Sequence, residues 1–291
     1  MALDDAERRD FPDIAIGQED FRRFCEFFYR RTGIVYDEAK RYYVDRRLRD
    51  RAAATGCRTF QSYFALLLVD RSELEALINA FTVNETYFYR ELHQLSCLGN
   101  DLLERIVAGK RRGTPLRLWS IPCSTGEEPY SIAIWLLENW TRADDWDIEI
   151  VGSDIDTGVL EAAEAGIYSE RALMRLPPPL VGKYFSRIGA GRYRIDEALR
   201  GSIRFTRVNV IDQVEMAQYR GFDVIFCRNM LIYFDEASRR AAADNLYDSL
   251  APSGYVCLGH TESMSRISPL FRVCRFPDAI VYQKPPEGGR A

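Results

Sequence analysis

The chain has 291 residues, 47% of them hydrophobic and 28% charged, which is the composition of a soluble globular protein with one large domain or two smaller ones. No apolar run is long enough and free enough of charge to cross a bilayer, and the polar start over residues 1–13 is not a signal peptide, so we expect a cytoplasmic protein without membrane insertion. The net charge of −4 is unfavourable for phosphate contacts, which argues against nucleic acid as a partner.

The first ninety or so residues predict a small helical domain. Thr32-Gly33 breaks the first helix, Thr55-Gly56 ends the second, and Ser72 is the expected N-cap of the last. Apolar side chains recur at helical spacing over 20–31, 59–70 and 72–81. Aromatic stripes at this spacing are typical of a packed core.

Charge is concentrated in this helical part. Residues 22–58 carry eleven Lys/Arg against five Asp/Glu, a net +6, which leaves −10 for the rest of the chain. Such asymmetry indicates either that the N-terminal part binds an acidic partner or that it presents a solvated helical face. The charge alone does not separate these two interpretations.

Strands alternate with helices from about Leu116 onward, which predicts an α/β domain with a mainly parallel sheet. The expected strands are LRLWSIPC, DIEIVGSDID, SIRFTRVNV, FDVIFCRN, GYVCLGHTES and DAIVYQK. Between about residues 174 and 202, Gly189, Gly191 and the alternation RYRID predict an inserted hairpin. We expect the tail PPEGGRA to be disordered.

Cysteine and histidine usage excludes several kinds of site. The seven cysteines are odd in number and contain no C-x-x-C pair, which argues against a disulfide framework and a zinc ribbon. His93 and His260 are the only histidines, so a His-ligated metal site is not expected. Whatever the chain catalyses, it lacks the usual histidine base.

Polar residues follow the expected strands, where open α/β sheets bind ligands. Glu127 and Glu128 follow a glycine turn and would repel a phosphate, and no G-x-G-x-x-G is present. Asp154 is placed to accept hydrogen bonds from a ribose, whereas Asp156 is better explained as a helix cap. Asn209 can bind an adenine edge, and such side chains together predict a site for a nucleoside without phosphates.

The ordered motifs resemble chemotaxis receptor glutamate methyltransferases, the CheR family. The resemblance covers nearly the whole chain, including the helical front and the inserted hairpin. It is carried by NETYFYRE (84–91), LWS (118–120) with STGEEPYS (124–131), SDID (153–156), RVNV (207–210), CRNMLIYFD (227–235) and GHTES (259–263).

This resemblance implies a seven-stranded S-adenosylmethionine-dependent methyltransferase sheet with its last strand antiparallel. The domains would be a helical domain with its linker over residues 1–90 and a methyltransferase domain over residues 91–291, the latter with an inserted β subdomain at about 174–202. The implied catalytic residues are Arg90 and Tyr233, and no metal is implied. The implied cofactor-binding residues are Asn84, Thr86, Arg90, Glu128, Asp154, Asn209, Val210, Arg228 and Asn229.

The implied reaction methylates glutamate carboxylates of chemoreceptor cytoplasmic domains and yields S-adenosylhomocysteine. The basic front domain would meet an acidic helical receptor bundle. The hairpin loop around RIGAGRYR is shorter than in enteric relatives that dock a receptor's C-terminal peptide there, so the resemblance does not carry peptide docking over to this chain.

Two other hypotheses stay open at this point. One is a non-catalytic adaptor that binds S-adenosylmethionine, and the other is a methyltransferase for small carboxylic acids.

Overall fold

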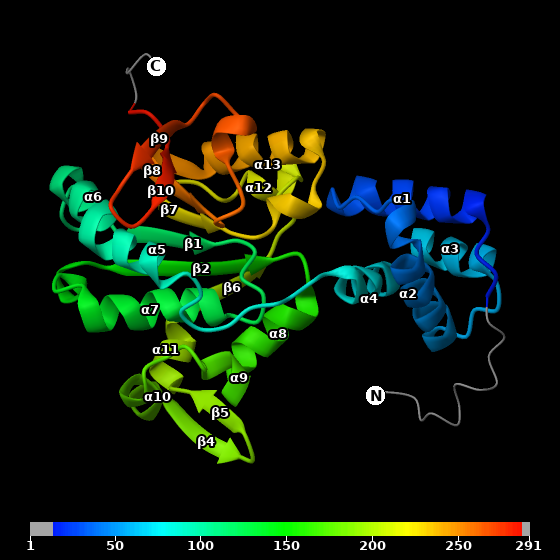
Figure 1. Cartoon of the computed structure of the whole chain (residues 1–291), viewed down its shortest axis with the longest axis horizontal. Coiled ribbons are helices and arrows are strands. Elements are labelled where there is room, and N and C mark those ends of the chain that lie inside the picture. The colour runs from blue at the N-terminus through cyan, green and yellow to red at the C-terminus, as the bar shows by residue number, and fades with distance from the viewer. Residues whose placement is uncertain (1–13, 287–291) are drawn as a thin grey trace. The chain divides into compact units, whose positions relative to one another are not determined.

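The computed structural model describes residues 14–286, so the expectations for residues 1–13 and for the end of the tail, 287–291, lie outside the described residues. These residues form two compact units (Figure 1). The helical unit contains 14–83 and 233–235, and the sheet unit contains 84–232 and 236–286. Among the described residues, no helix combines the length and apolar character needed to span a membrane.

The helical unit packs its helices around aromatic side chains. Phe24 and Phe28 from the first helix lie with their ring centres 5.2 and 5.0 Å from that of Phe81, at the end of the last helix. The main helices are α1 (Gln18–Thr32), α2 (Arg41–Ala54), α3 (Phe60–Val69) and α4 (Arg71–Phe81). The helical prediction is confirmed, but the N-cap of α4 is Asp70 rather than Ser72, because the Asp70 carboxylate accepts the N–H groups of Ser72 and Glu73.

The segment 233–235 belongs to the helical unit, although its sequence neighbours belong to the sheet unit. Ile34 and Phe234 form an antiparallel β-bridge, and Val35 N–H donates to the carbonyl of Tyr233 at 3.2 Å. Tyr29 Oη donates to the Asp235 carboxylate at 3.0 Å. Backbone and side-chain bonds therefore both hold this segment.

The sheet unit contains a seven-stranded sheet in the order β6-β2-β1-β7-β8-β10-β9. Neighbouring strands are parallel from β6 to β8, and β10 is antiparallel to both β8 and β9. The strands are β1 (Leu116–Ser120), β2 (Ile148–Asp154), β6 (Ile203–Arg207), β7 (Phe222–Cys227), β8 (Leu250–Leu258), β9 (Arg272–Arg275) and β10 (Ile280–Gln283). The predicted methyltransferase-type sheet is confirmed; β9 was not predicted.

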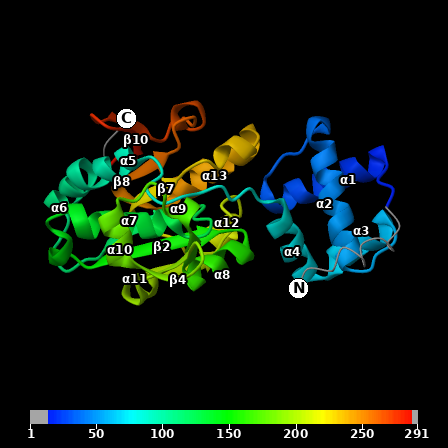
Figure 2. The same ribbon diagram turned by 60° about the horizontal axis from the view of Figure 1, so that its bottom comes forward.

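Helices cover both faces of this sheet (Figures 1 and 2). They include α5 (Leu92–Cys97), a π-helical turn (Leu98–Leu103), α6 (Glu104–Gly109), α7 (Glu127–Asn139), α8 (Thr157–Ala165), α12 (Gln213–Met216) and α13 (Glu236–Ser249). Every residue of β7 is buried, and Trp119 of β1 stacks on Tyr219 with ring centres 4.7 Å apart. Burial on both faces explains why the central strands are nearly continuous apolar runs.

A second, three-stranded antiparallel sheet has the order β3-β5-β4. The hairpin of β4 (Phe185–Gly189) and β5 (Arg192–Ile195) lies within the predicted insertion. The third strand, β3 (Ile167–Ser169), lies before that range and pairs with β5. Short helices α9 (Glu170–Leu173), α10 (Pro178–Tyr184) and α11 (Glu197–Ser202) flank these strands.

Candidate active site

The carboxyl ends of β1, β2 and β7 meet at one edge of the sheet because these strands are parallel neighbours. Ser120 at the end of β1 pairs in register with Gly152 of β2 and with Phe226 of β7. The segments that follow these strands therefore start side by side. They carry most of the polar residues singled out in the sequence.

Asp154, the last residue of β2, is a buried carboxylate with only 4% of its surface exposed. Its two oxygens accept the backbone N–H groups of Ser124, at 2.9 Å, and Asp156, at 3.1 Å. Burial raises the pKa of Asp154 to about 6, although these N–H donors act in the opposite direction. A carboxylate at a strand end thus titrates near neutral pH.

Asp156 caps α8, as the sequence predicts, because its Oδ1 accepts the N–H of Val159 at 3.2 Å. Its other oxygen accepts a hydrogen bond from Asn84 Nδ2 at 2.9 Å. Asn84 is the first residue of the sheet unit, and its carbonyl accepts from Ser124 Oγ at 3.4 Å. These bonds hold the start of the 84–91 segment, which also carries Thr86, against the ends of β1 and β2.

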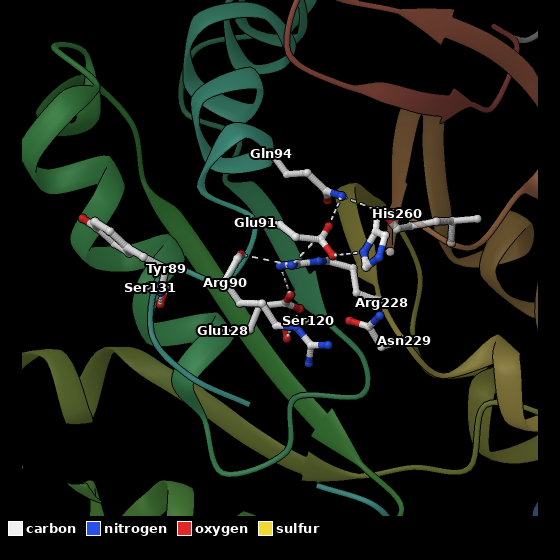
Figure 3. A network of polar contacts seen from close by, with 12 residues as sticks. Tyr89, Arg90, Glu91, Gln94, Ser120, Glu128, Ser131, Arg228, Asn229 and His260 are labelled. Carbon is white, nitrogen blue, oxygen red and sulfur yellow. Dashed lines mark hydrogen bonds and ion pairs between the residues drawn. The ribbon is translucent and has the colours of Figure 1, made fainter. Parts of the chain in front are cut away.

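Arg228, directly after β7, is buried and paired with two carboxylates (Figure 3). Its Nη1 donates to Glu128 Oε2 at 2.6 Å, and its Nη2 lies 3.3 Å from Glu91 Oε2. Nη2 also donates to the carbonyl of Arg90 at 3.0 Å. The partner that a buried arginine requires is thus supplied by the protein itself.

Glu128 lies in the first turn of α7 and faces the strand ends. Its second oxygen accepts from Ser120 Oγ at 2.8 Å. The preceding Glu127 is buried and accepts from Thr125 Oγ1 at 2.6 Å, and burial raises its pKa. In this fold Glu128, rather than Glu127, joins the polar network at the edge of the sheet.

Glu91 was not predicted as a site residue, although it organises one side of this network. It accepts from Gln94 Nε2 at 2.7 Å and lies 3.0 Å from His260 Nδ1, in addition to its ion pair with Arg228 (Figure 3). Burial alone would raise the pKa of Glu91, but Arg228 and His260 outweigh burial and lower it. Its only signal in the sequence was its place at the end of the NETYFYRE motif.

Glu262 is a second residue whose role was missed. Its carboxylate accepts the N–H groups of Asn229 at 2.8 Å, Leu231 at 2.8 Å and Gly259 at 2.9 Å. Burial raises the pKa of Glu262 despite these donors. One side chain after β8 therefore fixes the backbone of the loop after β7.

Asn209 and Val210 follow β6 and are both buried. The Asn209 N–H donates to Glu215 Oε2 at 2.7 Å, and its Oδ1 accepts the N–H of Ile211 at 3.3 Å. The Val210 carbonyl accepts from Asn245 Nδ2 at 2.8 Å. The turn after β6 is thus fixed through its backbone.

Arg90 differs from Arg228 in its partners. Its Nη1 donates to the Glu85 carbonyl at 2.7 Å, and its guanidinium carbon lies 5.8 Å from the ring centre of Tyr87. Within residues 14–286 it has no carboxylate within ion-pair distance. Tyr233, the other residue expected to be catalytic, is 39% exposed and belongs to the helical unit.

Backbone strain is concentrated in these same segments. Of the non-glycine residues with positive φ in the described part of the chain, Tyr89, Glu91, Ser124 and Asn229 lie in them; the fifth, Ser253, lies elsewhere. Such conformations cost of the order of 1–3 kcal/mol each and persist where surrounding contacts hold them. No group of three potential metal-ligating His, Cys, Asp or Glu side chains occurs among residues 14–286.

Known proteins match both units. Residues 19–82 match the family model described as CheR methyltransferase, all-alpha domain, and residues 84–280 match CheR methyltransferase, SAM binding domain. The chain is 48% identical to Chemotaxis protein methyltransferase 2 of Vibrio cholerae, covering 95% of this chain and 96% of that protein. It is 37% identical to the Chemotaxis protein methyltransferase of Salmonella typhimurium, covering 87% of each.

Proposed function

This chain belongs to the CheR family of chemotaxis methyltransferases, and we propose that it methylates glutamate side chains in the cytoplasmic domains of chemoreceptors. The methyl donor is S-adenosylmethionine, and the products are S-adenosylhomocysteine and a glutamate methyl ester. The protein acts in the cytoplasm, where these receptor domains lie.

The observation that carries this proposal is the contrast between two neighbouring arginines. Arg228 is neutralised by Glu91 and Glu128, whereas Arg90 has no carboxylate partner among the described residues. A half-exposed guanidinium is suited to bind a carboxylate through two parallel hydrogen bonds. Arg90 therefore supports a carboxylate, rather than a hydroxyl or amine, as the methyl acceptor.

The side chains at this edge of the sheet fit a methyl donor that carries hydroxyls and a positive charge but no phosphate. Asp154 and Glu128 are acceptors, and the positive charge of Arg228 is already paired. An ionised carboxylate has about four acceptor positions, so the two N–H bonds to Asp154 leave room for ribose hydroxyls.

We assign the remaining contacts by position. Asn209 and Val210, after β6, border the adenine, and Arg228 with Asn229 completes the pocket from the end of β7. Asn84, Thr86 and Arg90 contact the donor from the segment that enters the sheet unit.

When bound, the donor supplies a methyl group on a positively charged sulfonium. The acceptor glutamate has an ordinary pKa near 4.3 and arrives ionised, so no side chain needs to remove a proton. Arg90 orients the carboxylate, and most of the rate enhancement comes from positioning. Tyr233 is the second proposed catalytic residue, a hydrogen-bond donor near the acceptor.

The helical unit supplies the charge for receptor binding. Some of its cations are used internally, as in the ion pair of Arg51 with buried Glu73. Others are exposed and have no ion pair among the described residues: Arg22, Lys40, Arg46 and Arg58. These cations favour an acidic helical partner and would raise the rate of encounter with it.

Transfer of radiolabelled methyl groups to chemoreceptor cytoplasmic fragments tests the proposal, with release by base as proof of an ester. Arg90→Ala should reduce turnover strongly while S-adenosylhomocysteine still binds, and Tyr233→Phe should reduce it less. Arg112→Ala, a change at an exposed arginine of the same unit, is the matched control. Labelling of free carboxylic acids but not receptor fragments would refute the proposal, as would cofactor binding without transfer.

A further inference from the structure

A pocket of about 180 Å³ lies beside the loop that follows β7. Its walls come from Leu231 and Ile232, from the first turns of α13, and from residues 261–267 after β8. Open α/β sheets bind ligands outside the carboxyl ends of their strands, and this pocket lies at the ends of β7 and β8. The residues assigned above to the nucleoside follow mainly β1, β2 and β6.

Two arginines face this pocket without a carboxylate partner among the described residues. Arg239 is half-buried, and its Nε donates to the carbonyl of Leu231 at 2.8 Å. Arg266 is exposed and makes no side-chain bond within residues 14–286. By contrast, Arg240, the neighbour of Arg239, pairs with Glu236 at 3.6 Å.

The two carboxylates that line the same pocket have partners of their own. Glu262 accepts three backbone N–H groups, at 2.8 to 2.9 Å. Glu236 pairs with Arg240 and stands in the first turn of α13, where the helix dipole stabilises negative charge. The two arginines are therefore the charged side chains of the pocket that have no ion-pair or backbone N–H partner for their charge.

We propose that this pocket binds a second carboxylate of the acceptor protein, next to the one that is methylated. Thr261 and Ser263 add hydroxyl donors to the two guanidinium groups. At about 30 Å³ for one water molecule, the volume has room for an acidic side chain. Glu262 links the pocket to the site, because it also holds the N–H of Asn229.

This inference rests on the proposed function and makes Arg239 and Arg266 determinants of acceptor specificity. It requires the methylated glutamate to have an acidic neighbour on the receptor segment. The arginines would fix the register of that segment, so that one glutamate rather than another reaches Arg90.

The test compares Arg266→Ala with Arg272→Ala in methyl transfer to a receptor fragment. Arg266 has no internal bond to lose, and Arg272, an exposed arginine of β9, does not line the pocket. We expect Arg266→Ala to raise KM for the fragment about tenfold, as loss of a charged hydrogen bond does, with kcat and S-adenosylhomocysteine affinity unchanged. Arg266→Lys should recover part of the loss, and Arg239→Ala should add to it.

A second arm changes the acceptor. Replacing carboxylates beside the methylated glutamate with Gln should raise KM more for the unaltered protein than for Arg266→Ala, in which only Arg239 remains. An unchanged KM for Arg266→Ala, or an equal rise in Arg272→Ala, would overturn the inference and leave the proposed function intact. If the unaltered protein labels no receptor fragment, the proposed function fails, and this inference fails with it.

Discussion

Asp154 provides the sharpest test of the cofactor site, because its pKa is expected to control binding. The carboxyl is buried and has a pKa of about 6 in the free protein. Ribose hydroxyls donate to the ionised form, so the donor should bind that form preferentially. At pH 5 a group with this pKa is about 90% protonated, and affinity for S-adenosylhomocysteine should be roughly tenfold weaker than at pH 8.

The same carboxyl should make folding stability fall as the pH rises, whereas ligand affinity rises. The pKa of Asp154 is raised from 3.8 to about 6 in the folded protein, so the folded state binds more protons between these values. Stability is therefore greatest below pH 4 as far as this group is concerned, and falls as pH rises through 6. This rise in the pKa of Asp154 corresponds to about 3 kcal/mol of folding free energy. The free protein loses this stabilisation as the pH rises, and ligand binding partly restores it.

Calorimetric titration with S-adenosylhomocysteine from pH 5 to 8 measures this effect. Asp154→Asn should bind more weakly at pH 8 and lose the pH dependence. Glu127→Gln, which changes a buried carboxyl bonded to Thr125, is the matched control and should keep it. Equal affinities at pH 5 and pH 8 in the unaltered protein would refute the role of Asp154.

Three further predictions follow from the network and the charges. Arg228→Met leaves Glu91 and Glu128 without their shared arginine and should lower the free energy of unfolding by about 3–5 kcal/mol. In a thermal melt Tm should fall by roughly 10 °C, and an unchanged Tm would contradict a stabilising role of the buried ion pairs. Glu262→Gln places an amide N–H₂ against backbone donors, so turnover should fall several-fold while circular dichroism stays unchanged, and full activity would show that the loop after β7 needs no such support. Methylation should slow between low and physiological salt because the helical unit is basic, and a flat salt profile would favour the solvated-face interpretation.

Features that depend on local sequence were predictable. The buried strands appear as apolar runs, so the polar residues after them, such as Asp154 and Asn209, could be placed at one edge of a sheet. The cap at Asp156 followed from a single residue type before a helix. These predictions need only the period of the pattern and the rule for strand ends.

Features that depend on distant contacts were not predictable. Glu91 and Glu262 each bond to groups far away in the chain, and an isolated glutamate gives no sign of its partners. β9 is an exposed edge strand of four residues, too short for a clear alternation. Arg228 was expected only as a cofactor-binding residue, and its two carboxylate partners, Glu91 and Glu128, were not predicted.

The bridge between Ile34 and Phe234 bears on how this protein can be divided. The chain passes between the two units at three points, near residues 83, 232 and 235, rather than through one linker. A polypeptide beginning at Asn84 would keep the whole sheet but leave Phe234 without its β-bridge partner and Asp235 without Tyr29. Removing the front of the gene would thus alter the strand-to-helix connection that carries Tyr233, and exchange of front domains between relatives should succeed only when residues 233–235 are exchanged with them.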